Sequence, residues 1–86
     1  MSVTYVYVLK SFKNNSYYIG YASDLEKRLK QHNDGLVKAT QYKRPYKLVY
    51  YESFENVTKA RQREWAIKHK KSRKYIDWLI AGQLGV

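Results

Sequence analysis

The chain has 86 residues, enough for one small domain, which we place at residues 1–86. It contains no cysteine, which excludes disulfide bonds and thiolate metal sites and is consistent with a reducing compartment. Seventeen Lys and Arg against seven Asp and Glu give a formal net charge of +10, which is typical of a domain that binds a polyanion. We expect that polyanion to be nucleic acid. The alternatives are an anionic membrane surface and charge that serves only solubility.

The N-terminal segment, residues 1–10, has neither the basic start nor the long apolar run of a signal peptide or membrane span. We therefore expect a cytoplasmic protein without a membrane partner. No internal repeat, low-complexity tract or Pro/Gly/Ser-rich linker divides the chain.

The first part of the chain predicts a β-hairpin. Residues 3–10 alternate weakly and are rich in Val and Tyr, and residues 17–22 form a second β-rich run. The polar residues 13–16 between them are a turn signal. Gly20, inside the second strand, predicts either a β-bulge or a close approach by another part of the molecule.

A capped helix is predicted next. Ser23 and Glu26 fit a capping box, with Ser23 as the N-cap residue. Leu25 and Leu29 follow at helical spacing, and Gly35 marks the end of the helix. Residues beyond it form a basic loop, and Pro45 then precedes a third predicted strand at 46–54.

Two more helices complete the predicted fold. Asn56 or Thr58 can cap the first, which reaches roughly to Lys70. Ser72 caps the second, which is expected to end at Gly82. The order β-β-α-β-α-α predicts an α+β domain with a three-stranded antiparallel sheet flanked by helices.

One carboxylate falls on the apolar face of a predicted helix. Glu64 lies between Ala60 and Ile67 on the helical wheel. Burial of an unpaired charge is costly, so Glu64 needs a cation. That cation is either a nearby Lys or Arg in an ion pair, or a Mg²⁺ ion that takes Glu64 as a single oxygen ligand.

Arg28 and His32 lie one turn apart on the same side of the first helix, bordering its leucine stripe. In a basic protein this pair suggests phosphate recognition and proton transfer, against a solvated Arg and a structural His. Tyr7 and Tyr18, on the two hairpin strands, could serve either core packing or chemistry. An ordinary tyrosine is only about 0.1% ionised at pH 7, so a catalytic one needs help from a neighbouring group.

The chain resembles a small stand-alone GIY-YIG nuclease domain, the module also found in homing endonucleases, some restriction enzymes and a repair excinuclease. The resemblance covers nearly the whole chain, although Tyr5 stands where the family has glycine in its first triplet. The segments that carry it are Tyr5-Val6-Tyr7, Tyr18-Ile19-Gly20, residues 24–33, residues 48–52 and Arg63-Glu64, the last as the start of an acidic metal-binding turn.

The resemblance implies a GIY-YIG-type endonuclease that hydrolyses phosphodiester bonds in DNA, selecting structure rather than sequence, in repair or recombination. It also implies a Mg²⁺ or Mn²⁺ cofactor, DNA rather than RNA as the partner, and a possible partner protein that supplies specificity. The implied roles are metal ligand for Glu64, phosphate binding for Arg28, general base for Tyr7, proton relay for His32 and positioning of water or phosphate for Tyr18. For the general base, Tyr18 and His32 are the alternatives to Tyr7. The alternative is a non-catalytic nucleic-acid-binding module that keeps the fold.

A further set of basic residues is predicted to contact nucleic-acid phosphates without reading sequence. The alternative for this set is a solvated helix junction and loop. Its members are Lys38, Lys43, Arg44, Lys68, Lys70, Lys71, Arg73 and Lys74.

Overall fold

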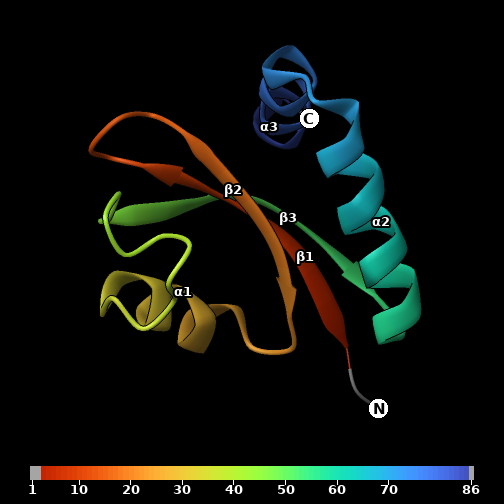
Figure 1. Cartoon of the computed structure of the whole chain (residues 1–86). Coiled ribbons are helices and arrows are strands. Elements are labelled where there is room, and N and C mark those ends of the chain that lie inside the picture. The colour runs from red at the N-terminus through yellow and green to blue at the C-terminus, as the bar shows by residue number, and fades with distance from the viewer. Residues whose placement is uncertain (1–2, 86) are drawn as a thin grey trace.

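The computed structural model describes residues 3–85, so the two limits of the predicted domain, 1 and 86, lie outside the described residues (Figure 1). The predicted α+β fold and element order are confirmed. The elements are β1 (Thr4–Ser11), β2 (Tyr17–Ala22), α1 (Leu25–Asn33), β3 (Tyr46–Phe54), α2 (Val57–Lys70) and α3 (Arg73–Gly85).

The sheet has the order β2-β1-β3, and β1 is antiparallel to both of its neighbours. Because side chains alternate along a strand, β1 supplies both faces of the sheet with buried residues. Tyr7 and Leu9 point to one face, and Val6 and Val8 point to the other; none of the four is more than 2% exposed. The central strand therefore reads as a nearly continuous apolar run.

Helices cover both faces of this sheet (Figure 1). Apolar residues of α1, among them Leu25 and Leu29, pack with Tyr7 and Leu9. On the opposite face, α2 and α3 bury apolar side chains against Val6 and Val8. The domain thus has three layers and two small cores, and the Tyr7 side chain belongs to the core beneath α1.

The start of α1 differs from the prediction. The N-cap is Asp24, whose carboxylate accepts a hydrogen bond of 3.0 Å from the Lys27 amide, and Ser23 lies outside the helix. Asp caps a helix about as well as Ser does, and its negative charge also favours the positive end of the helix dipole. Gly35, with φ of +79°, follows the end of the helix as predicted.

The caps of the later helices are as predicted, but the end of the last one is not. Asn56 caps α2 by accepting from the Lys59 amide at 2.9 Å, and Ser72 accepts from the Tyr75 amide at the start of α3 at 3.1 Å. However, α3 continues through Gly82 to Gly85. A glycine inside a helix costs only about 1 kcal/mol, which is too little to end a helix that packs on a core.

For Gly20, close approach rather than a bulge is the correct prediction. Its register with Tyr7 on β1 is regular, and the irregularity of the sheet lies instead between Val8 and Leu9, where β1 pairs with β3. The Tyr7 ring lies against the Gly20 backbone. Among residues 3–85, no helix has the length and apolar character needed to cross a membrane.

Candidate active site

Four of the predicted catalytic residues come together on the α1 side of the sheet. Tyr7 and Tyr18 lie on neighbouring strands, and Arg28 and His32 are on the side of α1 that faces them. His32 is fully buried, because the leucine stripe that docks α1 also carries the imidazole into the core. Arg28 is half-buried rather than fully solvated, and the burial of His32 is compatible with a structural as well as a catalytic histidine.

A hydrogen-bonded chain links three of these residues. The Tyr7 hydroxyl oxygen is 3.0 Å from His32 Nε2. Arg28 Nε donates to the same hydroxyl at 3.4 Å, and Arg28 Nη1 donates to Gln31 Oε1 at 3.1 Å. The guanidinium is thus oriented by its own helix, and it is only half-buried, so it remains accessible to a phosphate.

The other nitrogen of the imidazole has a partner that the sequence did not reveal. His32 Nδ1 is 2.7 Å from the hydroxyl oxygen of Thr40, a fully buried residue in the loop before β3. Neither periodicity nor a motif marks Thr40, because it reaches His32 from an irregular segment.

Two tyrosine rings pack against the same imidazole. The Tyr18 ring centroid is 5.0 Å from that of His32 with the planes tilted by 60°, and the Tyr46 ring centroid is 6.3 Å away. This packing fixes the plane of the His32 ring and excludes water from it. It also places the Tyr18 ring in contact with His32.

Burial sets the charge state of this group of residues. It lowers the pKa of His32 to about 4, and the positive charge of Arg28 acts in the same direction. Burial raises the pKa of the Tyr7 hydroxyl above its ordinary value, although the hydrogen bond and charge of Arg28 oppose the rise. At neutral pH both groups are therefore uncharged.

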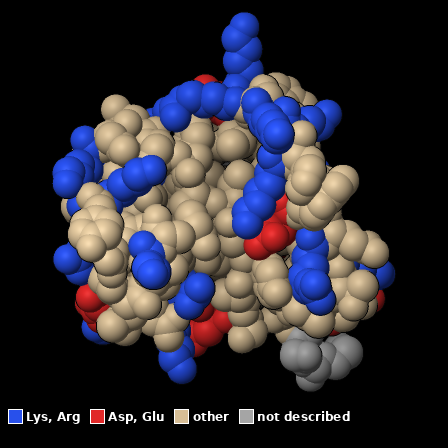
Figure 2. Space-filling model, in the orientation of Figure 1, with Lys and Arg blue, Asp and Glu red and all other residues tan. Residues whose placement is uncertain are grey.

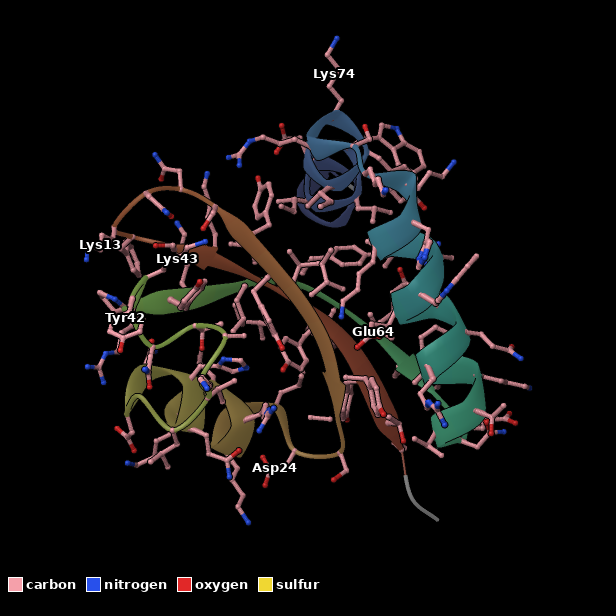
Figure 3. The ribbon with its side chains drawn as sticks, viewed as in Figure 1. Lys13, Asp24, Tyr42, Lys43, Glu64 and Lys74 are labelled. Atoms are coloured by element: carbon pink, nitrogen blue, oxygen red, sulfur yellow. The ribbon has the colours of Figure 1, made fainter. Side chains whose placement is uncertain are left out.

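Glu64 lies on α2, in the helical layer on the other side of the sheet from α1. Figure 3 shows its side chain pointing from α2 towards the strands. Its side chain is only 18% exposed, and Lys68 Nζ, one turn further along α2, lies 3.6 Å from its carboxylate. The predicted ion-pair alternative is therefore present. Burial is the main cause that raises the pKa of Tyr7, and the Glu64 charge adds only a small contribution in the same direction.

The acidic turn expected around Arg63 and Glu64 is not a turn. Both residues lie in the middle of α2, and Arg63 forms an ion pair with Glu52 of β3, with Nε–O distances of 3.0 and 3.1 Å. This pair attaches α2 to the sheet. Glu64, one residue later, is turned by about 100° around the helix and so points in a different direction.

The residues present fit a divalent cation held mainly by substrate and water. Among residues 3–85, no three His, Cys, Asp or Glu side chains gather to form a protein cage for a metal. Glu64 lines a shallow pocket with Thr58, Arg61, Gln62 and Trp65. Mg²⁺ commonly takes one or two protein carboxylates and completes its shell with water and phosphate oxygens. The single, partly exposed carboxylate of Glu64 meets that requirement.

On the face of the molecule that Figure 2 shows, Lys and Arg side chains border a central depression, with acidic surface near its middle. The predicted nucleic-acid contacts separate into two groups, one in the loop before β3 and one at the junction of α2 and α3. Lys43 and Lys74, one from each group, lie at distant edges of the face (Figure 3). Lys13 lies beside the first group, since its Nζ donates to the Tyr42 carbonyl at 3.1 Å, a contact that no sequence pattern predicts.

Two members of the junction group also hold the fold together. The Arg73 guanidinium lies 4.4 Å from the centroid of the Tyr17 ring on β2, and Lys70 Nζ lies 5.0 Å from that of Tyr75 on α3. These cation–π contacts stabilise the docking of α3. A phosphate contact by Arg73 or Lys70 would have to be made alongside them.

Comparison with known proteins gives a consistent family. Residues 3–76 match the family model described as the GIY-YIG catalytic domain. The chain is 40% identical over 83 residues to a UPF0213 protein of Staphylococcus saprophyticus, covering 95% of this chain and 100% of that relative. It is 49% identical over 67 residues to a UPF0213 protein of Clostridium perfringens, covering 77% of this chain and 71% of the relative.

A solved structure agrees with the sequence matches. The fold is similar to the solution NMR structure of the UPF0213 protein BH0048 from Bacillus halodurans, with a TM-score of 0.58 and 34% sequence identity. The similarity covers 92% of this chain and 83% of that one. The segment matched by the family model includes Tyr7, Tyr18, Arg28, His32 and Glu64.

Proposed function

The chain belongs to the GIY-YIG catalytic domain family, a nuclease superfamily, and from that premise we propose that it is a metal-dependent endonuclease acting on DNA. The observation that carries the proposal is the hydrogen bond from Tyr7 to the buried, neutral His32, with Arg28 donating to the same hydroxyl. These contacts support the roles proposed here: Tyr7 as base, His32 as its proton acceptor and Arg28 as the phosphate-binding cation.

Arg28 binds the scissile phosphate in this proposal. Its planar guanidinium can hold two phosphate oxygens and stabilise the negative charge that develops on them during attack. The Gln31 contact orients the guanidinium for this role. Tyr18, packed against His32 on one side, orients the phosphate or the attacking water.

The proton of the attacking water passes through Tyr7 to His32. Because the pKa of Tyr7 is raised above 10, a resting phenolate is negligible at neutral pH. The two transfers are therefore coupled: Tyr7 Oη takes a proton from water while its own proton moves to His32 Nε2. The water oxygen forms a bond to phosphorus, the bond to the leaving oxygen breaks with its electron pair, and that oxygen takes a proton from solvent.

Substrate binding makes His32 a better acceptor. In the substrate-free protein, the charge of Arg28 adds to burial in lowering the His32 pKa. A phosphate paired with Arg28 offsets that positive charge and brings a negative charge close to the imidazole. The pKa of His32 therefore rises when the proton has to be accepted, and the buried imidazole afterwards returns the proton through the Tyr7 hydroxyl.

Glu64 holds the divalent cation, Mg²⁺ or Mn²⁺. A bound ion supplies Lewis acidity at a phosphate oxygen and stabilises charge on the leaving oxygen. Lys68 stays one turn away as the counter-charge of Glu64 in the metal-free protein. The two basic groups at the edges of the face hold the DNA backbone without reading sequence, which supports selection of DNA structure, in repair or recombination, with specificity open to a partner protein.

The test is cleavage of duplex, flapped and branched DNA with Mg²⁺ or Mn²⁺. Glu64→Gln is expected to abolish cutting while DNA binding remains, because the charge that holds the cation is lost and the shape is kept. Glu55→Gln is the matched control, since Glu55 carries the same charge on the exposed surface before α2. Failure of the wild-type protein to cut any of these substrates would remove the proposal.

One observation favours a second function, that of a non-catalytic nucleic-acid-binding module. The Lys68 ion pair gives Glu64 a counter-charge with no need for a metal. A binding module predicts DNA affinity that is unchanged by Arg28→Ala and Glu64→Gln, with no turnover in any variant. Turnover that depends on both residues would exclude it.

A further inference from the structure

Thr40 is a buried polar side chain in an otherwise open loop. Its exposure is 0%, whereas Ala39 before it is exposed and Lys43 after it is exposed. Burial of a hydroxyl without partners is unfavourable, so a loop residue in this position has to be satisfied by hydrogen bonds. Its partners are His32 Nδ1 and the Val37 carbonyl.

The loop holds Thr40 in place by backbone contacts. The Thr40 amide donates to the Val37 carbonyl at 3.1 Å, and the Lys43 amide donates to the Thr40 carbonyl at 3.0 Å. The end of β1 anchors the same loop, because the Ser11 hydroxyl donates to the Lys43 carbonyl and the Phe12 amide donates to the Pro45 carbonyl. The Thr40 hydroxyl is therefore fixed against the imidazole rather than placed there by a mobile tip.

The direction of the hydrogen bonds around His32 follows from the groups at the two ends of this network, the Val37 carbonyl and the Arg28 guanidinium. The Val37 carbonyl can only accept, so the Thr40 hydroxyl donates to it and its oxygen accepts from His32 Nδ1–H. His32 Nε2 then carries a lone pair and accepts from the Tyr7 hydroxyl. At the other end, the Arg28 guanidinium can only donate, and it donates to the Tyr7 oxygen. Every donor in this network has an acceptor.

The reversed network fails at the Tyr7 end. If Thr40 donated to Nδ1, the Val37 carbonyl would lose the Thr40 hydroxyl as a donor but would keep the Thr40 amide. Nε2–H would then donate to the Tyr7 oxygen, which already accepts from Arg28. Within residues 3–85, the Tyr7 hydroxyl has His32 and Arg28 as its hydrogen-bond partners, so its own proton would be left without an acceptor. A buried donor without an acceptor is costly, so the first network is favoured.

We propose that Thr40 is a positioning residue that fixes His32 in the tautomer with its proton on Nδ1, leaving Nε2 ready to take the proton of Tyr7. The catalytic consequence rests on the proposed nuclease function. The assignment of the tautomer rests on the hydrogen-bond geometry alone. In this proposal the basic loop before β3 contributes the buried Thr40 hydroxyl to the site, in addition to its exposed lysines.

Nitrogen NMR of the uniformly ¹⁵N-labelled protein at pH 7 tests the tautomer directly, through couplings from the ring C–H protons to each ring nitrogen. The wild-type protein is expected to show a pyrrole-like Nδ1 and a pyridine-like Nε2 at His32. Thr40→Val, which keeps the shape and removes the hydroxyl, is expected to give a mixture of tautomers or the reverse tautomer. Thr40→Ser, which keeps the hydroxyl, is expected to restore the wild-type pattern.

A proton on Nε2 in the wild-type protein overturns the inference, even if Thr40→Val does not fold. An unchanged tautomer in a folded Thr40→Val protein overturns it as well. In the cleavage assay, Thr40→Val is expected to lower kcat roughly 10- to 100-fold with little change in KM, and Thr40→Ser to recover the rate. If the tautomers behave as stated but no variant cuts DNA, the nuclease function fails and the assignment of Thr40 stands.

Discussion

The phenol ring of Tyr7 lies against the backbone of Gly20, its antiparallel partner on β2. A Cβ atom at position 20 would lie 2.5 Å from the Tyr7 hydroxyl oxygen and 2.7 Å from Cζ, closer than carbon atoms tolerate. The missing side chain is what allows the Tyr7 hydroxyl to reach His32. The glycine of the second sequence triplet and the tyrosine of the first are therefore parts of one arrangement.

Gly20→Ala is accordingly expected to displace the Tyr7 ring, with a loss of about 1–3 kcal/mol in the free energy of unfolding and a loss of cleavage activity. Thermal and urea unfolding measure the first effect. Gly82→Ala is the matched control, because a Cβ there meets nothing within 4 Å. Inside α3 it is expected to stabilise the protein by about 0.5–1 kcal/mol. Equal unfolding free energies for wild type and Gly20→Ala would contradict the close contact.

Stability is expected to fall in mild acid because of His32. Its pKa is about 4 in the folded protein against 6.5 in an unfolded chain, so between these values the unfolded state binds a proton that the folded state does not. Lowering the pH from 6.5 to about 4 therefore removes stability, by up to about 3 kcal/mol. Urea unfolding from pH 8 to pH 4 measures this dependence.

Replacement of His32 isolates its share of that dependence from the share of the carboxylates. His32→Gln is expected to show a shallower loss of stability over the same pH range, whatever its stability at pH 8. His69→Gln, at the exposed end of α2, serves as the control. Parallel curves for wild type and His32→Gln would show that the imidazole is not buried in its neutral form.

Removal of the Tyr7 hydroxyl is expected to lower the rate of DNA cleavage without lowering the affinity for DNA. Tyr7→Phe is expected to lower the cleavage rate on the order of 10²- to 10⁴-fold, the usual contribution of a positioned base, with DNA affinity retained. It also leaves His32 Nε2 without its donor, so a loss of about 1–3 kcal/mol in the free energy of unfolding is expected. Tyr5→Phe is the control, since the Tyr5 ring packs edge-on against Tyr51. Equal cleavage rates for wild type and Tyr7→Phe would exclude Tyr7 as the base.

The basic edges of the face predict a defined salt dependence of DNA binding. Lys43→Gln and Lys74→Gln are each expected to reduce the slope of log affinity against log salt by about 0.9 on duplex DNA, because each loses one phosphate contact. Lys59→Gln is the control, since Lys59 faces Glu55 at 3.9 Å near the start of α2. Fluorescence anisotropy over a salt series measures the slopes. No change for Lys43 and Lys74 would mean that DNA does not span the face.

Local sequence patterns predict the fold well because each element has its own signal. The alternation and β-branched residues of β1, the glycine after α1 and the caps Asn56 and Ser72 all act within a few residues. Errors occur where two signals of similar strength compete, as with Ser23 and Asp24 at the start of α1. The same holds for Gly82, where tertiary packing outweighs a weak local preference.

The site is less predictable because it depends on contacts between distant segments. Residue type and spacing identify Arg28 and His32 as a pair, but not that His32 is buried or that its pKa is lowered. Thr40 escapes prediction altogether, since its role exists only once the loop folds back over α1. The sequence predicts that Glu64 has either a metal ion or a basic side chain as its partner. Only the structure identifies Lys68 as that basic side chain.

Single-turnover cleavage of one labelled DNA substrate with Mg²⁺, by wild type and Glu64→Gln from matched preparations, tests the nuclease assignment most directly. DNA affinity measured in the same buffer establishes that both proteins are bound. The account predicts metal-dependent cutting by the wild-type protein and a loss of roughly 100-fold or more in rate for Glu64→Gln, since a bound cation is worth several kcal/mol in the transition state. Cutting by Glu64→Gln at the wild-type rate, or bound DNA that the wild-type protein leaves intact, would contradict it.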